Sequence, residues 1–164
     1  MGLLRFPLAA VFAVLTIPTL CLTAAAQSHS HGYMLFAPGV VSGGGETEPT
    51  LELALGGEAV FARRIGIGVE VGGVGLRGST DSGFGLGSIN GYYHLPRANS
   101  RRDPFLTVGY SQVIPFDVSL FNFGGGMNWW FAPHLGMKVV FRDYVYKGSG
   151  RANLGTFGFG VAFH

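Results

Sequence analysis

Three glutamates and two basic residues are the groups of this sequence best placed to act together inside a fold. Each falls on the polar side of a segment in which large apolar residues alternate with small or polar ones; they are Glu52, Glu58, Glu70, Lys138 and Arg142. Buried charges are tolerated only when they are paired. We therefore expect an interior network of ion pairs that joins some of the glutamates to Lys138 and Arg142. A structural plug is the preferred role of this network, and a gated narrow pore or proton path is the alternative.

The histidines are the other residues that could do chemistry, and they are His29, His31, His94, His134 and His164. A barrel enzyme that edits membrane lipids needs a nucleophilic serine beside a histidine and an acid, and the sequence has no His-x-Ser-Asn pattern. His94 and His134 fall at strand ends. If these strands cross an outer membrane, both histidines lie on the periplasmic side, whereas lipid editing occurs at the outer leaflet. His29 and His31 could serve near a new N-terminus, because cleavage after Ala26 would place His29 third from a free amine. Such a histidine can chelate Cu(II) or Ni(II), but the N-terminal Gln27 would often cyclise. We expect no catalytic residue, no cofactor and no metal site.

Strands must position these groups, because no amphipathic helical period follows Gln27. Eight segments show strand patterns, at about 32–41, 50–61, 65–77, 83–95, 104–112, 119–131, 135–146 and 153–164. We expect a glycine-rich polar loop at 42–49 and a bulge at Gly72-Gly73. Tight turns are expected after the second and sixth strands, and glycine- and serine-rich external loops after the first, third and seventh. The connection after the fourth strand is an exception, because it is longer than a minimal turn.

The hairpin at 119–146 favours a membrane over a soluble sandwich, which would also alternate. Its apolar face is large, and aromatic residues cluster beside the turn. Aromatic girdles form where a barrel crosses the membrane–water interface. We assign the girdle to Tyr92, Tyr93, Trp129, Trp130 and Phe131. Because no water can satisfy an open strand edge in hydrocarbon, the last strand must pair with the first. The expected fold is all-β: a closed, eight-stranded, antiparallel up-and-down transmembrane β-barrel.

Composition and the N-terminal segment agree with an exported membrane protein. The chain has 164 residues, of which 48% are hydrophobic and only 12% are charged, with a formal net charge of +2. This balance gives no sign of a nucleic-acid partner. Arg5, an apolar run and Ala24-Ala25-Ala26 predict a cleaved signal peptide at 1–26, followed by one barrel domain at 27–164. Cys21, the single cysteine, lies within that signal.

Three parts of the sequence carry a resemblance to a known family. One of them is 141–144, which reads FRDY. Residues 124–136 read GGGMNWWFAPHLG, and the last strand alternates aromatic and apolar residues with glycine and alanine: Phe157, Phe159, Val161 and Phe163. The chain resembles the small eight-stranded outer-membrane barrels of the OmpA-barrel and OmpX-like type. The resemblance implies a Gram-negative outer-membrane location after export to the periplasm, contact with outer-membrane lipids, and insertion by the barrel-assembly machinery through the C-terminal strand. One departure is that family members commonly end in an aromatic residue, whereas here His164 follows Phe163.

The expected function is therefore a monomeric, non-enzymatic barrel with a structural or envelope role, which could also pass small solutes. An outer-leaflet lipid-modifying barrel enzyme is one alternative. The other is a soluble lipocalin-like carrier of a small apolar ligand, in which apolar residues would face inward. The side chains on the outer face decide between the soluble carrier and a membrane barrel. A soluble carrier would expose Glu70 and Arg142, whereas a membrane barrel would expose Ile67, Val69 and Phe141.

Overall fold

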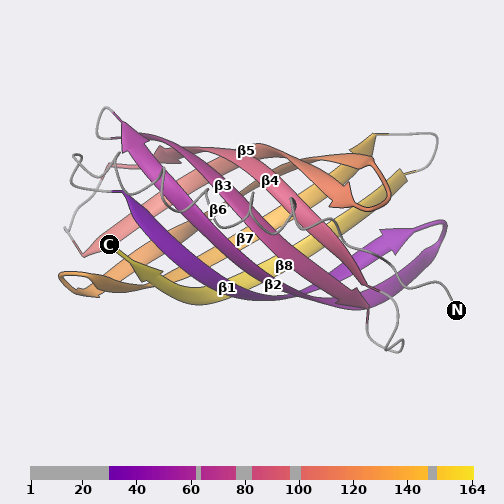
Figure 1. Ribbon diagram of the computed structural model, residues 1–164, viewed down its shortest axis with the longest axis horizontal. Coiled ribbons are helices and arrows are strands. Elements are labelled where there is room, and N and C mark those ends of the chain that lie inside the picture. Colours follow the sequence, from indigo (N-terminus) through magenta and orange to yellow (C-terminus); the bar gives the residue numbers. More distant parts are fainter. Residues whose placement is uncertain (1–29, 62–63, 77–82, 97–100, 148–150) are drawn as a thin grey trace, which may run out of the picture.

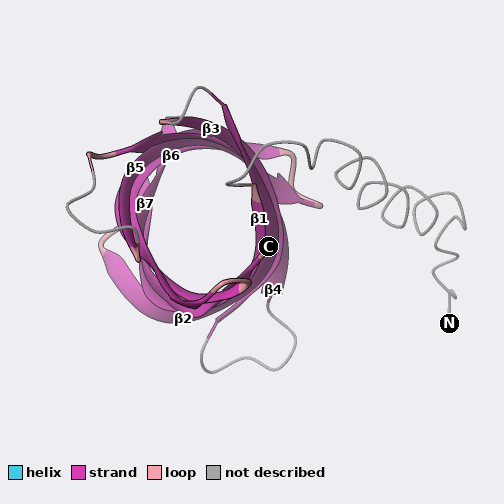
Figure 2. Cartoon of the chain, turned by 90° about the vertical axis from the view of Figure 1, so that its left-hand side faces the viewer, coloured by secondary structure: helices cyan, strands magenta, loops and turns pink. Residues whose placement is uncertain are grey.

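The chain forms a closed β-barrel in the computed structural model, which describes residues 30–61, 64–76, 83–96, 101–147 and 151–164 (Figure 1). Within these residues eight strands follow one another: β1 (His31–Gly43), β2 (Glu46–Phe61), β3 (Ile65–Leu76), β4 (Gly83–His94), β5 (Arg102–Ile114), β6 (Val118–Ala132), β7 (Leu135–Lys147) and β8 (Arg151–Phe163). Each strand pairs antiparallel with its neighbours in sequence, and β8 pairs with β1 to close the ring (Figure 2). The predicted closed, eight-stranded up-and-down barrel is confirmed, while the predicted signal peptide lies outside the described residues. No helix formed by the described residues is both long and apolar enough to cross a membrane.

The first hairpin is tighter than the sequence indicated. The predicted loop at 42–49 is wrong, because β1 and β2 continue to pair until only Gly44 and Gly45 remain between them. Both glycines have positive φ, +62° and +89°. Two successive residues in this region are what a two-residue hairpin turn requires, and glycine adopts it without steric cost.

The predicted bulge at Gly72-Gly73 is also wrong. Both glycines stay in register with β2, opposite Ala54 and Leu53. A Cβ on Gly72 would lie 2.7 Å from the carbonyl oxygen of Leu53, so glycine permits close packing of the strands at this point. Among the described strand pairs, a register shift lies instead between Trp130 and Ala132.

The two ends of the barrel cannot be told apart by the length of their connections. We call the end where β1 begins and β8 stops the terminus-side end, and the opposite one the far end. The connections are 62–64, 95–101 and 133–134 at the terminus-side end, and 44–45, 77–82, 115–117 and 148–150 at the far end. The short connections predicted after β2 and β6 are confirmed, whereas those after β1 and β7, which were expected to be longer, are equally short.

Side chains are distributed inside out relative to a soluble barrel. On β3, Ile67 is 55% exposed on the outer face whereas Glu70 is 3% exposed in the lumen. The same alternation runs round the ring, because successive residues of a strand point to opposite faces. Apolar residues such as Val69 and Phe141 face outward, while Arg142 lies inside. This arrangement contradicts the soluble-carrier alternative.

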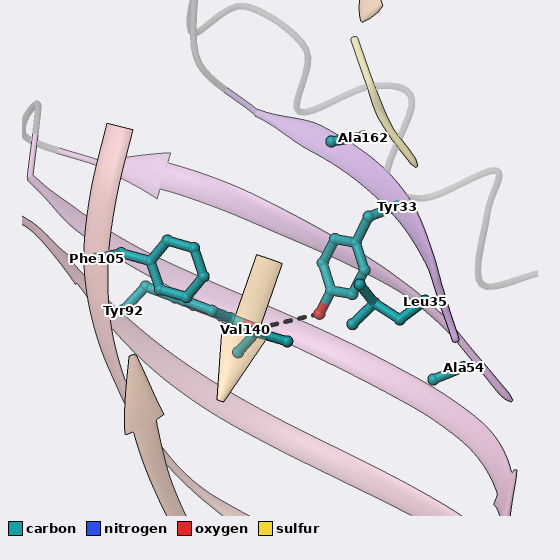
Figure 3. Close-up of a cluster of buried hydrophobic side chains, with 7 residues drawn as sticks. All are labelled: Tyr33, Leu35, Ala54, Tyr92, Phe105, Val140 and Ala162. Carbon is teal, nitrogen blue, oxygen red and sulfur yellow. Dashed lines mark hydrogen bonds between the residues drawn. The ribbon is translucent and has the colours of Figure 1, made fainter. Parts of the chain in front are cut away.

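Two apolar clusters fill opposite halves of the lumen. The terminus-side cluster contains Tyr33, Leu35, Ala54, Tyr92, Phe105, Val140 and Ala162 (Figure 3). The far-side cluster contains Val74, Leu86, Val113, Leu120, Tyr144 and Leu154. Buried charged and polar side chains lie among and between them.

Candidate functional site

Glu70 and Arg142 form an ion pair across the lumen. Glu70 comes from β3 and Arg142 from β7, and each side chain is only 2% exposed. The Nη1 group of Arg142 donates to Oε1 of Glu70 and also to the hydroxyl of Tyr144, at 3.0 Å. The hydroxyl of Tyr33 donates to the other oxygen of Glu70 at 3.0 Å. The alternation of β3 and β7 therefore brings together one of the acid–base pairs that the sequence allowed.

Glu58 is the centre of a second cluster at the terminus-side end. Its Oε2 lies 3.5 Å from Nζ of Lys138 and 3.4 Å from Nε2 of His31. Its Oε1 lies 2.6 Å from Nε2 of His94, whose Nδ1 is 3.0 Å from both carboxylate oxygens of Asp103. We call Glu58, Lys138, His31, His94 and Asp103 the Glu58 cluster.

Glu52 differs from the other two glutamates. Among the described side chains it forms no ion pair with Lys138 or Arg142, and the hydroxyl of Tyr144 donates to it at 3.5 Å. It is nevertheless buried on the inner face of β2. The alternation of residues along β2 predicts correctly that Glu52 lies in the lumen. It does not predict which side chain Glu52 contacts there.

Aromatic rings surround the ammonium group of Lys138. Its Nζ lies 4.5 Å from the ring centre of Tyr33, 5.1 Å from that of Tyr92 and 4.2 Å from that of Phe105. The hydroxyls of Tyr33 and Tyr92 are 3.0 Å apart, as the dashed line in Figure 3 marks. Ring faces attract a cation most when it is desolvated, and Lys138 is 0% exposed. These rings, together with Glu58, offset the cost of burying the charge.

Of the five residues assigned to the aromatic girdle, three face outward and two do not. Tyr93, Trp129 and Phe131 are exposed on the outer face. Tyr92 is buried, and Trp130 packs against the terminus-side cluster and stacks on His164 with ring centres 4.1 Å apart. The physical reason is the strand period of two: adjacent residues face opposite sides, so neither Tyr92-Tyr93 nor Trp129-Trp130 can present both rings to lipid.

The residues assigned to the C-terminal assembly strand share the outer face of β8. Phe157, Phe159, Val161 and Phe163 are all exposed there. His164 lies beyond the strand, where its Nδ1 is 3.0 Å from the carbonyl oxygen of Ser30. A role of this strand in assembly remains a prediction.

Sequence reasoning missed three members of the Glu58 cluster, His31, His94 and Asp103, and a row of small polar residues. This polar wall belongs to β4, β5 and β6, and consists of Ser88, Asn90, Thr107, Ser111, Asn122 and Asn128. Ser111 bonds to Ser88 and Asn122, each at 2.8 Å. A signal was available: Ser88, Asn90, Tyr92 and His94 share one parity of β4.

Both ring nitrogens of His94 face carboxylates, so this ring is not available to activate a serine hydroxyl. No group of three or more His, Cys, Asp or Glu side chains in the described ranges could hold a metal ion. Of the two histidines considered for N-terminal chelation, His31 is buried beside Glu58, and His29 is outside the described residues.

Comparison with known proteins identifies the fold. No protein-family model matches the sequence, and no curated protein does. Neisserial surface protein A superposes with a TM-score of 0.64 at 12% identity, covering 82% of this chain and 96% of that one. The N-terminal barrel domain of Pseudomonas aeruginosa OprF gives 0.59 at 14% identity, covering 84% and 98%. The attachment invasion locus protein Ail of Yersinia pestis gives 0.57 at 14% identity, covering 84% and 100%. The chain has the fold of the small eight-stranded outer-membrane barrels.

Proposed function

We propose that the protein is an integral outer-membrane barrel with a structural, non-enzymatic role in the envelope. The observation that carries this proposal is the outer face. It presents large apolar side chains on every strand, including Met34, Leu53, Ile67, Ile89 and Val108, each more than half exposed. An exposed apolar surface that runs round a whole molecule is far larger than the few hundred Å² that soluble monomers expose. A lipid bilayer is the solvent that suits it.

The expected orientation places the terminus-side end in the periplasm. An even number of strands puts both chain ends on one side, as in other bacterial barrels. Outer-membrane lipids would contact the outer face, and the barrel-assembly machinery would engage β8 during insertion. We expect the folded protein to be a monomer.

Side chains that meet across the lumen support the structural role. The terminus-side and far-side clusters fill the two halves, and the Glu70–Arg142 pair crosses between them. An eight-stranded barrel is only wide enough for its interior to be filled by side chains. Passage of small solutes is a second candidate, because the polar wall of β4–β6 includes Asn90, whose side-chain amide makes no hydrogen bond within the described structure.

Two measurements on refolded protein test the proposal. Residues 27–164 refolded into detergent micelles or liposomes should migrate differently on SDS gels before and after boiling, because closed membrane barrels resist SDS until heated. Absence of a shift, together with solubility in plain buffer, would contradict the membrane barrel. In planar bilayers the same protein should show no steady conductance above background. Reproducible channel steps would favour solute passage over a structural plug.

The non-enzymatic part has its own test. The engagement of His94 by two carboxylates supports it, because the ring has no nitrogen left to act as a base for a serine. Folded protein incubated with radiolabelled lipid A or phospholipid should yield no deacylated product by thin-layer chromatography. A product that accumulates with time would establish the lipid-modifying alternative.

A further inference from the structure

Four buried polar side chains in the middle of the lumen keep hydrogen-bonding atoms that no described group of the protein satisfies. These atoms are Nδ2 and Oδ1 of Asn90, Oδ1 of Asn122, Oγ1 of Thr107, and Nε and Nη2 of Arg142. Each of the four residues is at most 4% exposed. Buried polar groups of native proteins almost always have a partner, which is either protein or ordered water. These atoms therefore call for a ligand.

Strand pairing brings these side chains into two adjacent rows on four consecutive strands. Asn90 of β4 and Asn122 of β6 lie in one row, on either side of Gly109. Thr107 of β5 and Arg142 of β7 lie in the next row, on either side of a glycine of β6. The rows are two residues apart along β5 and β6, so they are neighbours on the same, inner face. The four polar side chains therefore belong to one patch of the lumen wall.

The two amides of this patch approach each other over Gly109. A Cβ at this glycine would overlap Oδ1 of Asn90 and would lie 3.0 Å from Nδ2 of Asn122. That Nδ2 group donates to Ser111, which leaves Oδ1 as the unpartnered atom of Asn122. The amides thus lie close together, and no hydrogen bond joins these two described side chains.

Apolar clusters enclose the polar patch on both sides along the barrel axis. The inward residues of β4 run from Leu86 of the far-side cluster, through Ser88 and Asn90, to Tyr92 of the terminus-side cluster (Figure 3). Arg142 occupies the same interval on β7, between one member of each cluster. The patch is therefore part of a polar layer between two apolar ones.

The unpartnered atoms favour a small neutral molecule over an ion. Nε and Nη2 of Arg142 and Nδ2 of Asn90 are donors, whereas the Oδ1 atoms of Asn90 and Asn122 are acceptors. An ion would satisfy only one of these two kinds, whereas water satisfies both. The charge of Arg142 is already paired with Glu70, and Glu52 lies one hydrogen-bonded hydroxyl away. The further charge is thus negative, which disfavours an anion, while the guanidinium group disfavours a cation.

We propose that Asn90, Thr107, Asn122 and the Nε–Nη2 edge of Arg142 form a binding site for a cluster of ordered water molecules, here called the mid-lumen site. A buried water typically makes about three hydrogen bonds to groups that would otherwise be unsatisfied, so the six unpartnered atoms suit about two waters. The site rests on the barrel fold and not on the structural role proposed above. It gives the lumen a hydrated centre between the two apolar clusters.

The test uses NMR of isotopically labelled residues 27–164 refolded in detergent micelles, with water as the probe. Cross-relaxation transfers magnetisation from a long-lived bound water to the protein protons that it touches. We expect water cross peaks, with the sign of slowly tumbling protons, at the side-chain amide of Asn90 and at the Nε proton of Arg142. The backbone amide of Ala54, in the terminus-side cluster, should show none. The cross peak at Asn90 should persist in Thr107→Val, which removes the hydroxyl through which water protons could exchange.

A matched pair of variants locates the water. Asn90→Leu should remove most of the cross peak at the Nε proton of Arg142, whereas the same substitution at Asn128, outside the site, should leave it unchanged. The heat-dependent gel shift shows whether each variant folds, and the unmodified barrel alone decides where a variant does not.

The outcomes separate this site from the other proposals. A folded barrel without water cross peaks at Asn90 and Arg142 would overturn the mid-lumen site. Cross peaks that disappear in Thr107→Val, or that are as strong in Asn90→Leu as in Asn128→Leu, would overturn it as well. Absence of the gel shift in the unmodified chain would overturn the membrane barrel instead, and channel steps in planar bilayers would contradict the structural role.

Discussion

Replacing Arg142 by alanine tests whether the lumenal ion pair stabilises the barrel. An exposed ion pair contributes about 0–1 kcal/mol, whereas breaking a buried pair costs about 3–5 kcal/mol. Both side chains of the Glu70–Arg142 pair are 2% exposed, so the buried regime applies. The substitution would leave the Glu70 carboxylate with the hydroxyl of Tyr33 as its remaining partner. We expect Arg142→Ala to lower the free energy of unfolding by about 3–5 kcal/mol.

Urea unfolding in lipid vesicles, followed by tryptophan fluorescence and by the gel shift, measures this loss. Arg102→Ala is the matched control, because it removes the same side chain from the exposed rim and should cost no more than about 1 kcal/mol. Replacing Glu70 and Arg142 together should cost about 2–3 kcal/mol less than the sum of the single changes, because neither charge is then left unpaired. An unchanged unfolding midpoint in Arg142→Ala, or strict additivity in the double variant, would refute the ion-pair argument.

Three further predictions follow from side-chain placement. His94→Ala should lower the free energy of unfolding by about 3 kcal/mol or more in the same urea assay, because two buried carboxylates lose their shared partner; a loss below 1 kcal/mol would contradict it. Gly124→Ala should destabilise the barrel strongly, because its methyl would overlap a backbone carbonyl of β7. Gly73→Ala should be close to neutral, because nothing lies within 4 Å of the added methyl. An equally small effect of both substitutions would show that the lumen tolerates the methyl at Gly124. Brominated phosphatidylcholine should quench Trp130→Phe, which keeps Trp129, much more than Trp129→Phe; the reverse order would mean that the two rings are assigned to the wrong faces.

The strand pattern could be predicted from the sequence because the membrane and the lumen impose opposite chemistries on alternate residues. Segments such as 65–71, in which isoleucine and valine alternate with glycine and Glu70, admit one interpretation. The same alternation placed all three predicted glutamates, Lys138 and Arg142 on the inner face. Errors arose where one residue type has two uses. Gly44 and Gly45 form a tight turn but suggested a loop, and Gly72 permits close strand packing but suggested a bulge.

The partners within the lumen could not be predicted, because they depend on the stagger of strands that are distant in sequence. Glu52 and Glu58 are both inward residues of β2, yet only Glu58 lies at the height of Lys138. A parity argument fixes the face of a side chain but says nothing about its height along the barrel axis. The aromatic rings round Lys138 illustrate the same point, because they come from β1, β4 and β5.

These contacts also explain why the same residues cannot easily serve both as a plug and as an open path. Ladder hydrogen bonds join only neighbouring strands, whereas Glu58–Lys138 joins β2 to β7 and Glu70–Arg142 joins β3 to β7. Such bridges across the ring resist its flattening and at the same time occupy its interior. Solute passage would require at least the second bridge to break, and the separated charges of Glu70 and Arg142 would then have to be solvated within the lumen. We therefore expect the barrel to be closed in its resting state.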